Sequence, residues 1–182
     1  MRKRLISYDE YKGYVNDICV QLHRSDWKPD YIVGISRGGL LPAVMISQML
    51  NVPMKPLQVS LREHVECVSD LGMAEDAFGA VPAEDQKVIG SRWDISYQKN
   101  ILIVDDINDQ GSTINWIVDD WPAGCYPNSE RWDHVWNNNV RFAVIVDNLS
   151  SKCKIMMDYV GCEINKADED EWIVFPYEEW WK

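Results

Sequence analysis

The sequence predicts an α/β domain in which a central parallel sheet is flanked by helices. Short apolar runs rich in Ile and Val alternate along the chain with segments of helical periodicity. This alternation is typical of parallel sheets whose crossovers are right-handed. The chain has 182 residues, of which 46% are hydrophobic. The length predicts a single domain over residues 1–182, and the composition suffices for a sizeable core.

The first predicted element is an amphipathic helix over residues 8–24. Ser7 and Glu10 have the spacing of a capping box, in which each side chain satisfies a backbone amide of the other. Apolar side chains between Tyr11 and Leu22 then recur at helical spacing. The sequence therefore predicts that this helix packs one face on the sheet.

The remaining elements follow in alternation. Each predicted strand is a short apolar run, and each predicted helix begins after small or polar residues. We expect strands over 31–35, 55–61, 101–104 and 140–146, and helices over 40–50 and 114–121.

Two stretches break this rhythm. Residues 62–92 mix Glu, Asp, Gly, Ala and Pro without strong periodicity, and residues 122–139 are rich in Trp, Asn and Pro. Long irregular stretches within compact domains are usually functional lids or inserts. We predict a flexible lid over 62–92 and an irregular insertion over 122–139.

The most informative segment is residues 101–113, which read ILIVDDINDQGST. Its apolar run ends in Asp105 and Asp106, and Asp109 follows. The carboxylates would lie at the carboxyl end of a buried strand, where open α/β sheets bind their ligands. Gln110, Gly111, Ser112 and Thr113 would then open a helix.

The small residues of this segment favour a phosphate, because a helix N-terminus presents free backbone amides. The neighbouring carboxylates would repel a phosphate unless they hold Mg²⁺ or accept hydrogen bonds from the hydroxyls of a sugar. The segment therefore predicts a site for a phosphorylated sugar and a metal.

A second loop has a similar position. Ser36, Arg37, Gly38 and Gly39 follow the strand at 31–35 and precede the helix at 40–50. Glycines allow the backbone to approach a ligand closely. The guanidinium of Arg37 suits a pair of pyrophosphate oxygens. The alternative is an ordinary glycine turn with a surface Arg, which the presence of the other phosphate-type loop makes less favoured.

These motifs carry a resemblance to a known family. The segment VDDINDQGST resembles the ribosyl-pyrophosphate signature of type I phosphoribosyltransferases, apart from Gln110, where Thr is common. The segment GISRGGLLP, residues 34–42, and the segment DEWIVFPY, residues 170–177, look most like the bacterial xanthine–guanine branch.

The resemblance implies a small C-terminal hood over residues 164–182, in which Trp172 stacks on the base and Ile173 presents backbone groups to its edge. Trp172 could instead be a core or dimer-interface anchor. The family's pyrophosphate loop often carries a cis peptide, so Ser36–Arg37 is expected to be cis.

The implied reaction is transfer of the 5-phosphoribosyl group from phosphoribosyl pyrophosphate to a 6-oxopurine, in purine salvage. Asp105 and Asp106 would hold the ribose hydroxyls and Mg²⁺, directly or through water. Asp109 would be the general base or a hydrogen-bond acceptor at the purine N7 side. The pyrophosphate-sugar substrate would contact Ser36, Arg37, Gly38, Asp105, Asp106, Asp109, Gln110, Gly111, Ser112 and Thr113.

The acceptor base is the open point. The resembling branch reads the 6-oxo group with a lysine near the end of the strand at 140–146, and Asp147, Asn148 and Leu149 stand there in this chain. Weaker base discrimination is therefore expected. A phosphoribosyltransferase fold that only senses a nucleotide, or one that acts on a non-purine acceptor, are the alternatives.

The composition narrows the function further. A net charge of −11 disfavours nucleic-acid partners, and the chain has no apolar run long enough to span a membrane. The five cysteines are scattered, without a CxxC pair, which favours reduced thiols in the cytoplasm. The aromatic C-terminal tail suggests a homo-oligomer, either a dimer or a tetramer.

Overall fold

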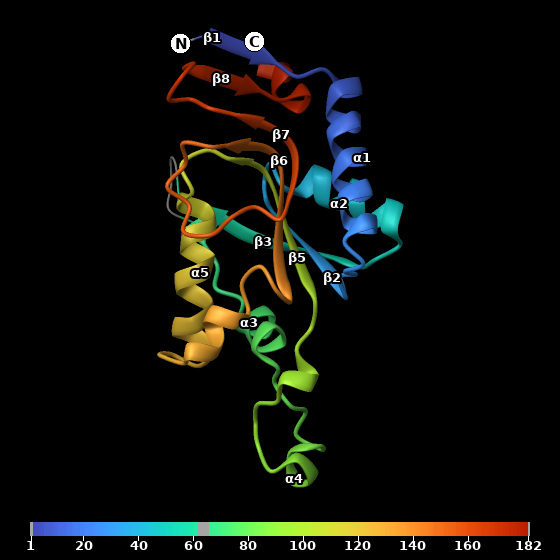
Figure 1. Ribbon diagram of the computed structural model, residues 1–182, viewed down its shortest axis with the longest axis vertical. Coiled ribbons are helices and arrows are strands. Elements are labelled where there is room, and N and C mark those ends of the chain that lie inside the picture. Colours follow the sequence, from blue (N-terminus) through green and yellow to red (C-terminus); the bar gives the residue numbers. More distant parts are fainter. Residues whose placement is uncertain (1, 62–65, 182) are drawn as a thin grey trace.

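The computed structural model describes residues 2–61 and 66–181. Within them, a six-stranded sheet has the strand order β4-β3-β2-β5-β6-β7 (Figure 1). All neighbours are parallel except β3 and β4. The strands are β2 (Tyr31–Ser36), β3 (Met54–Ser60), β4 (Glu66–Cys67), β5 (Ile101–Asn108), β6 (Val140–Asn148) and β7 (Tyr159–Ile164). The predicted parallel α/β architecture is confirmed.

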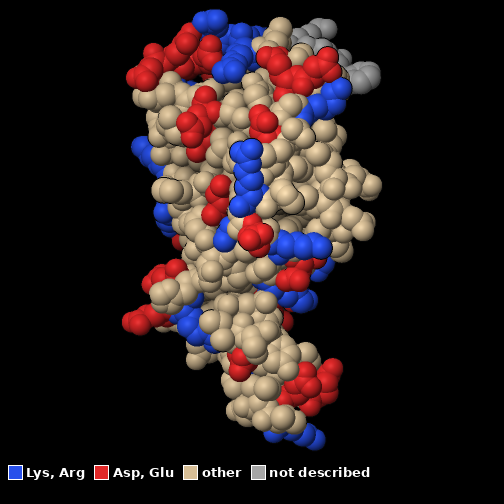
Figure 2. Space-filling model, turned by 45° about the vertical axis from the view of Figure 1, so that its right-hand side comes forward, with Lys and Arg blue, Asp and Glu red and all other residues tan. Residues whose placement is uncertain are grey.

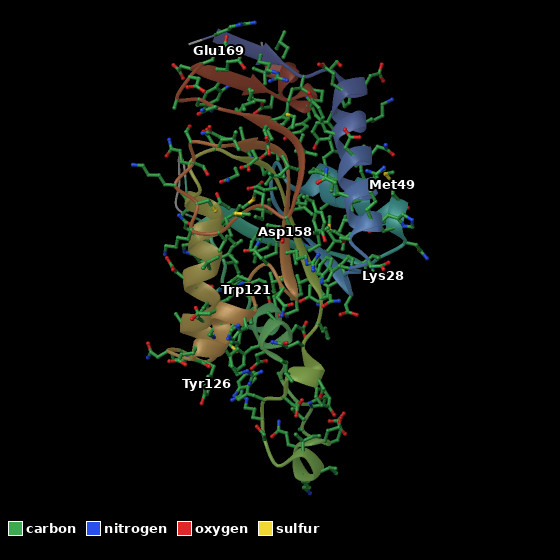
Figure 3. All side chains as sticks on the ribbon, viewed as in Figure 1. Lys28, Met49, Trp121, Tyr126, Asp158 and Glu169 are labelled. Carbon is green, nitrogen blue, oxygen red and sulfur yellow. The ribbon has the colours of Figure 1, made fainter. Side chains whose placement is uncertain are left out.

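Helices cover both faces of the sheet, with α1 and α2 on one side and α3 and α5 on the other (Figure 1). Met49 on α2 and Trp121 on α5 mark these two sides in Figure 3. The helices are α1 (Tyr8–Arg24), α2 (Leu40–Leu50), α3 (Leu71–Phe78), α4 (Gln86–Ile89) and α5 (Ser112–Cys125), with 3₁₀ turns at Ile95–Tyr97, Glu130–His134 and Pro176–Trp181.

The helices predicted over 8–24 and 40–50 are confirmed residue for residue. The capping box is also present: the Ser7 hydroxyl accepts from the Glu10 amide at 3.2 Å, and the Ser7 amide donates to the Glu10 carboxylate at 2.8 Å. Reciprocal capping of this kind fixes where the helix begins, so a local signal was sufficient here.

Strand β5 shows how the sheet holds both helical layers. Leu102 and Val104 pack towards α1 and α2, whereas Ile101 and Ile103 pack towards α3 and α5. All four are at most 1% exposed. Successive side chains of a strand point to opposite faces, so a continuous apolar run is expected where both faces are covered. The carboxylates that follow this run are thereby fixed to a rigid strand.

The irregular stretch expected over 62–92 is different in the structure. Residues 62–65 lie outside the described residues. Helix α3 contributes Met73, Ala77 and Phe78 to the core, so this part is structural. Helix α4 lies on an arm at the far end of the molecule from the hood (Figure 1). A lid role for residues 62–92 stays a prediction.

The stretch over 122–139 is also more ordered than expected. Helix α5 continues through Pro122 to Cys125, four residues beyond the predicted end. Trp132 is 4% exposed and stacks on Trp136, with ring centroids 5.6 Å apart. The aromatic residues that make this stretch look irregular in sequence pack against the α3 side of the sheet.

The hood contains a strand that the sequence patterns did not predict. Strand β1 (Arg2–Leu5) pairs in parallel with β8 (Glu171–Val174) as a separate two-stranded sheet. The N- and C-terminal segments therefore lie side by side at one end of the molecule (Figure 1). The hood is built from both ends of the chain, and not from residues 164–182 alone.

Candidate active site

The loop after β5 begins helix α5 with a glycine that the geometry requires. Gly111 has a φ of 81°, in the left-handed region that favours glycine. A Cβ at this position would lie 2.5 Å from the amide nitrogen of Cys153. Ser112 then starts the helix, whose first amides have no acceptor within the helix. The loop thus presents a helix N-terminus to the cavity beside it.

The loop after β2 lies against the same carboxylates. A Cβ on Gly38 would overlap the Asp106 side chain, and a Cβ on Gly39 would overlap the backbone oxygen of Val104. These two glycines therefore allow the β2 loop to touch the end of β5. The Ser36–Arg37 peptide is cis, which confirms the expectation from the resemblance.

Two adjoining cavities of about 430 Å³ and about 450 Å³ lie at this edge. Leu61, Asp105, Ile107, Thr113 and Trp172 line both of them. The first is also lined by Asp109, Gln110, Gly111 and Ser112, and the second by Ser36, Arg37, Gly38 and Asp106. The structure brings together every predicted site residue except Ile173.

Trp172 and Ile173 alternate on strand β8. Trp172 is 42% exposed and faces the cavities, whereas Ile173 is 6% exposed and packs into the α1 side of the core. A strand places successive side chains on opposite faces, so Ile173 could contact a ligand only through its backbone. Stacking of Trp172 on a base and backbone contact by Ile173 stay predictions.

The acidic pair is held by local hydrogen bonds. The Asp106 amide donates to Asp105 Oδ1 at 2.9 Å, and the Tyr177 hydroxyl donates to Asp106 Oδ2 at 2.7 Å. Burial, followed by the negative charge of Asp106, raises the pKa of Tyr177 far above the usual tyrosine value. Tyr177 therefore stays a protonated donor at physiological pH.

Asp109 has a partner that the sequence patterns did not predict. Its Oδ1 lies 2.6 Å from Nζ of Lys166, and the two side chains are only 20% and 19% exposed. Asn148 fixes both residues: its Nδ2 donates to the Asp109 carbonyl at 2.8 Å, and its Oδ1 accepts from the Lys166 amide at 3.0 Å. A lysine thus reaches the site from the loop after β7.

Lys152 and Lys154, the first lysines after β6 in the sequence, have other contacts. Lys154 pairs with Asp119 at 2.6 Å, and both side chains are about half exposed. The Lys152 amide donates to the carbonyl of Gln110 at 3.2 Å, which ties its loop to the β5 loop. Lys166 follows β7, a strand that the sequence reading did not predict, so no local signal pointed to it.

The two carboxylates fit a magnesium ion in their chemistry. Mg²⁺ prefers oxygen ligands and is usually bound through one or two carboxylates, with water and substrate phosphates completing six positions. Asp105 and Asp106 offer such oxygens at a cavity shared with Arg37 and Thr113. Among the residues that the structure describes, no cluster of three or more His, Cys, Asp or Glu side chains surrounds a metal position.

In the described part of the chain, no helix is long and apolar enough to cross a membrane.

Residues 7–180 match the family model described as the phosphoribosyl transferase domain. The chain is 24% identical over 179 residues to xanthine-guanine phosphoribosyltransferase of Idiomarina loihiensis, an alignment that covers 97% of this chain and 88% of that protein. It is 26% identical over 129 residues to xanthine phosphoribosyltransferase 1 of Saccharomyces cerevisiae, covering 62% of this chain and 57% of that protein. The match thus spans just over half the length of the yeast relative.

Among solved structures, the fold is similar to that of a purine phosphoribosyltransferase from Pyrococcus horikoshii. The TM-score is 0.62 with 22% sequence identity, and the alignment covers 99% of this chain and 96% of that chain. The similarity in fold therefore covers nearly the whole chain and is not limited to the two loops.

Proposed function

Because the chain belongs to the phosphoribosyl transferase domain family, we propose that it transfers the 5-phosphoribosyl group from phosphoribosyl pyrophosphate to a 6-oxopurine and releases pyrophosphate. One observation carries the proposal: the β2 and β5 loops and Trp172 line the same pair of cavities. The relatives named for xanthine and guanine support a purine acceptor. The reaction would serve purine salvage.

The phosphate groups divide between the two loops. The N-terminus of α5, with Ser112 and Thr113, binds the 5′-phosphate through amides and hydroxyls. Arg37 stabilises the negative charge that develops on the leaving pyrophosphate. Mg²⁺ held by Asp105 and Asp106, directly or through water, would neutralise further charge on that group. Fixing both ends of the substrate aligns its C1 for attack by the base.

Asp109 and Lys166 complement one edge of a 6-oxopurine. That edge carries N7 beside the O6 acceptor. Asp109 accepts a proton or a hydrogen bond at the N7 side, and the Lys166 ammonium, 2.6 Å away, donates to O6. An adenine would turn its amino group, a donor, towards the ammonium. The expectation of weak base discrimination is thereby revised, since a partly buried charged donor is present.

The remaining parts of the proposal concern the cellular compartment, the oligomeric state and the partners of the protein. We propose reaction in the cytoplasm, supported by five scattered cysteines without a CxxC pair, and a homo-oligomer, either a dimer or a tetramer. We propose no nucleic-acid partner, because the net charge is −11.

A panel assay tests the function. Pyrophosphate release is measured with Mg²⁺, phosphoribosyl pyrophosphate and one of guanine, hypoxanthine, xanthine, adenine or uracil. We expect turnover with the three 6-oxopurines and little with adenine or uracil. Binding of phosphoribosyl pyrophosphate without turnover on any base would favour the nucleotide-sensing alternative, and turnover with uracil alone would favour a non-purine acceptor.

Lys166→Met sharpens the assignment of the base. We expect the ratio of kcat/KM for hypoxanthine over adenine to fall by about ten-fold or more, because the charged donor that rejects the amino group is lost. Lys154→Met is the matched control, since Lys154 makes an ion pair of the same length at the surface. Equal ratios in the two variants would remove Lys166 from base selection.

A further inference from the structure

We propose that Tyr177 is a positioning residue that sets the geometry of Asp106 for phosphoribosyl pyrophosphate and links that acid to the base-binding hood. The inference rests on the proposed function, because Asp106 is assigned there to the ribose hydroxyls and the metal. It goes further because Tyr177 belongs to neither phosphate loop and lies just beyond strand β8.

The Tyr177 ring is fixed by two aromatic neighbours. It stacks on Phe175 with centroids 5.5 Å apart and an interplanar angle of 2°, and it meets Tyr11 of α1 edge-on at 6.1 Å. Tyr11 also packs edge-on against Phe175 at 6.1 Å. Phe175 and Tyr11 are at most 3% exposed. The phenol therefore projects from a packed aromatic cluster, and its hydroxyl has little freedom to move.

The Tyr177 hydroxyl and Gly38 of the β2 loop both lie close to Asp106 Oδ2. The hydroxyl donates to Asp106 Oδ2 at 2.7 Å, while the carboxylate abuts Gly38, where any Cβ would overlap it. The Asp106 side chain therefore has a close neighbour in the β2 loop and a hydrogen-bond donor in Tyr177. Arg37, Asp106 and Tyr177 all line the second cavity together with Trp172.

A tyrosine has a specific chemical advantage in this position. It is a neutral donor, so it engages one carboxylate oxygen without the charge neutralisation that a lysine or arginine would cause. The other oxygen of Asp106 is then oriented for a ribose hydroxyl or a metal-bound water. Hydrogen bonds to a charged group are among the stronger ones, so removing this donor should weaken the binding of the substrate.

The same residue connects two parts of the site. Trp172 lies on β8, and Tyr177 follows it after five residues in the same C-terminal segment. A ligand that orders Asp106 therefore also favours the position of the segment that carries the base-stacking face. Coupling of this kind is reciprocal, so a base analogue should in turn strengthen substrate binding through Tyr177.

Tyr177→Phe tests the proposal, with Tyr11→Phe as its matched control. Both changes keep an aromatic ring in the cluster. The Tyr11 hydroxyl is buried and has no hydrogen-bond partner among the described residues, whereas that of Tyr177 binds Asp106. We expect Tyr177→Phe to raise the dissociation constant of Mg²⁺–phosphoribosyl pyrophosphate by about ten-fold in calorimetry, and Tyr11→Phe to leave it within two-fold. Thermal unfolding of both variants checks that the cluster is intact.

A double-mutant cycle shows whether Tyr177 acts through Asp106. In an Asp106→Asn background, Tyr177→Phe should have little further effect on binding. A full ten-fold effect in that background, or equal effects of Tyr177→Phe and Tyr11→Phe, overturns the inference. Failure of the unchanged protein to bind the substrate at all overturns the proposed function instead, so the two failures are distinct.

Discussion

The carboxyl edge of the central sheet and the hood line the same cavities, but different interactions hold them in place. Strand β5, which carries the acids, is buried between two helical layers, with four successive apolar residues at most 1% exposed. The outer end of the hood is fastened by ion pairs such as Arg2–Glu169, whose side chains are 71% and 60% exposed. Figure 2 shows acidic and basic side chains gathered at that end of the molecule.

This difference separates the two halves of the candidate site. Exposed ion pairs contribute only ~0–1 kcal/mol each, whereas burying one large apolar side chain contributes ~1.5–3 kcal/mol. The phosphate-binding half is therefore rigid and intolerant of change. The hood is fixed where Ile173 and Phe175 are buried, and its outer end is more easily displaced. Changes in the phosphate-binding half should abolish activity, and changes in the hood should tune affinity for the base.

The largest effect is expected at Asp109. Asp109→Asn should lower kcat by about 10²–10⁴, the usual contribution of a general base, while binding of phosphoribosyl pyrophosphate changes far less. Initial rates and calorimetry measure the two quantities. Asp119→Asn is the control: it removes a carboxylate that makes an ion pair of equal length on the surface, and it should leave kcat unchanged. Unchanged turnover in Asp109→Asn would remove this residue from the chemistry.

The next effect tests the rigid half by packing alone. Gly39→Ala should lower the free energy of unfolding by about 1–3 kcal/mol, because the new Cβ meets the backbone of β5. Gly13→Ala is the control: it lies within α1 and a Cβ there meets nothing within 4 Å. That change should stabilise the protein by ~0.5–1 kcal/mol. Urea unfolding measures the change in the free energy of unfolding for both variants. Changes of the same sign in the two variants would contradict the prediction.

A smaller effect is expected on the hood face. Trp172→Ala should raise the KM for every accepted base by a similar factor, on the order of ten-fold for ~1–3 kcal/mol of stacking. The KM for phosphoribosyl pyrophosphate should change little. If base affinity is untouched, Trp172 is a packing residue, and the purine assignment depends on the phosphate loops and Lys166.

The smallest effect concerns the fastening of the hood. Arg2→Ala removes ion pairs to Glu169 and Glu171. It should raise the KM for the base by up to roughly five-fold, since surface pairs contribute at most ~1 kcal/mol. The free energy of unfolding of the central sheet should be unchanged. A larger effect on phosphoribosyl pyrophosphate than on the base would show that the two halves are not separate.

The same division explains what the sequence could predict. The helix over 8–24, the apolar run of β5 and the glycines of both loops have local signals, because capping, strand burial and turn conformation act over a few residues. The partners Lys166 and Tyr177 have none. Each meets its carboxylate only in the folded chain, because the paired positions are 57 and 71 residues apart in sequence (166 − 109 and 177 − 106).

The helix α3 was missed for a related reason. It has only eight residues, and its N-cap Asp70 and C-cap Gly79 lie in a stretch otherwise rich in polar residues. Phe78 packs against the rings of Tyr126 and Trp132, which sequence patterns do not bring together. Short helices depend on such tertiary packing more than on propensity.

The pairing of β1 with β8 also orders events during protein synthesis. Residues 2–5 are synthesised before the central sheet, and their partner strand at 171–174 follows only after that sheet has been made. Strands β2 and β5, with both phosphate loops, are complete long before β8 appears. Domains generally fold as units during synthesis. Strand β1 has no partner strand until β8 has been made, so the base-binding face cannot assemble before the C-terminal segment is available.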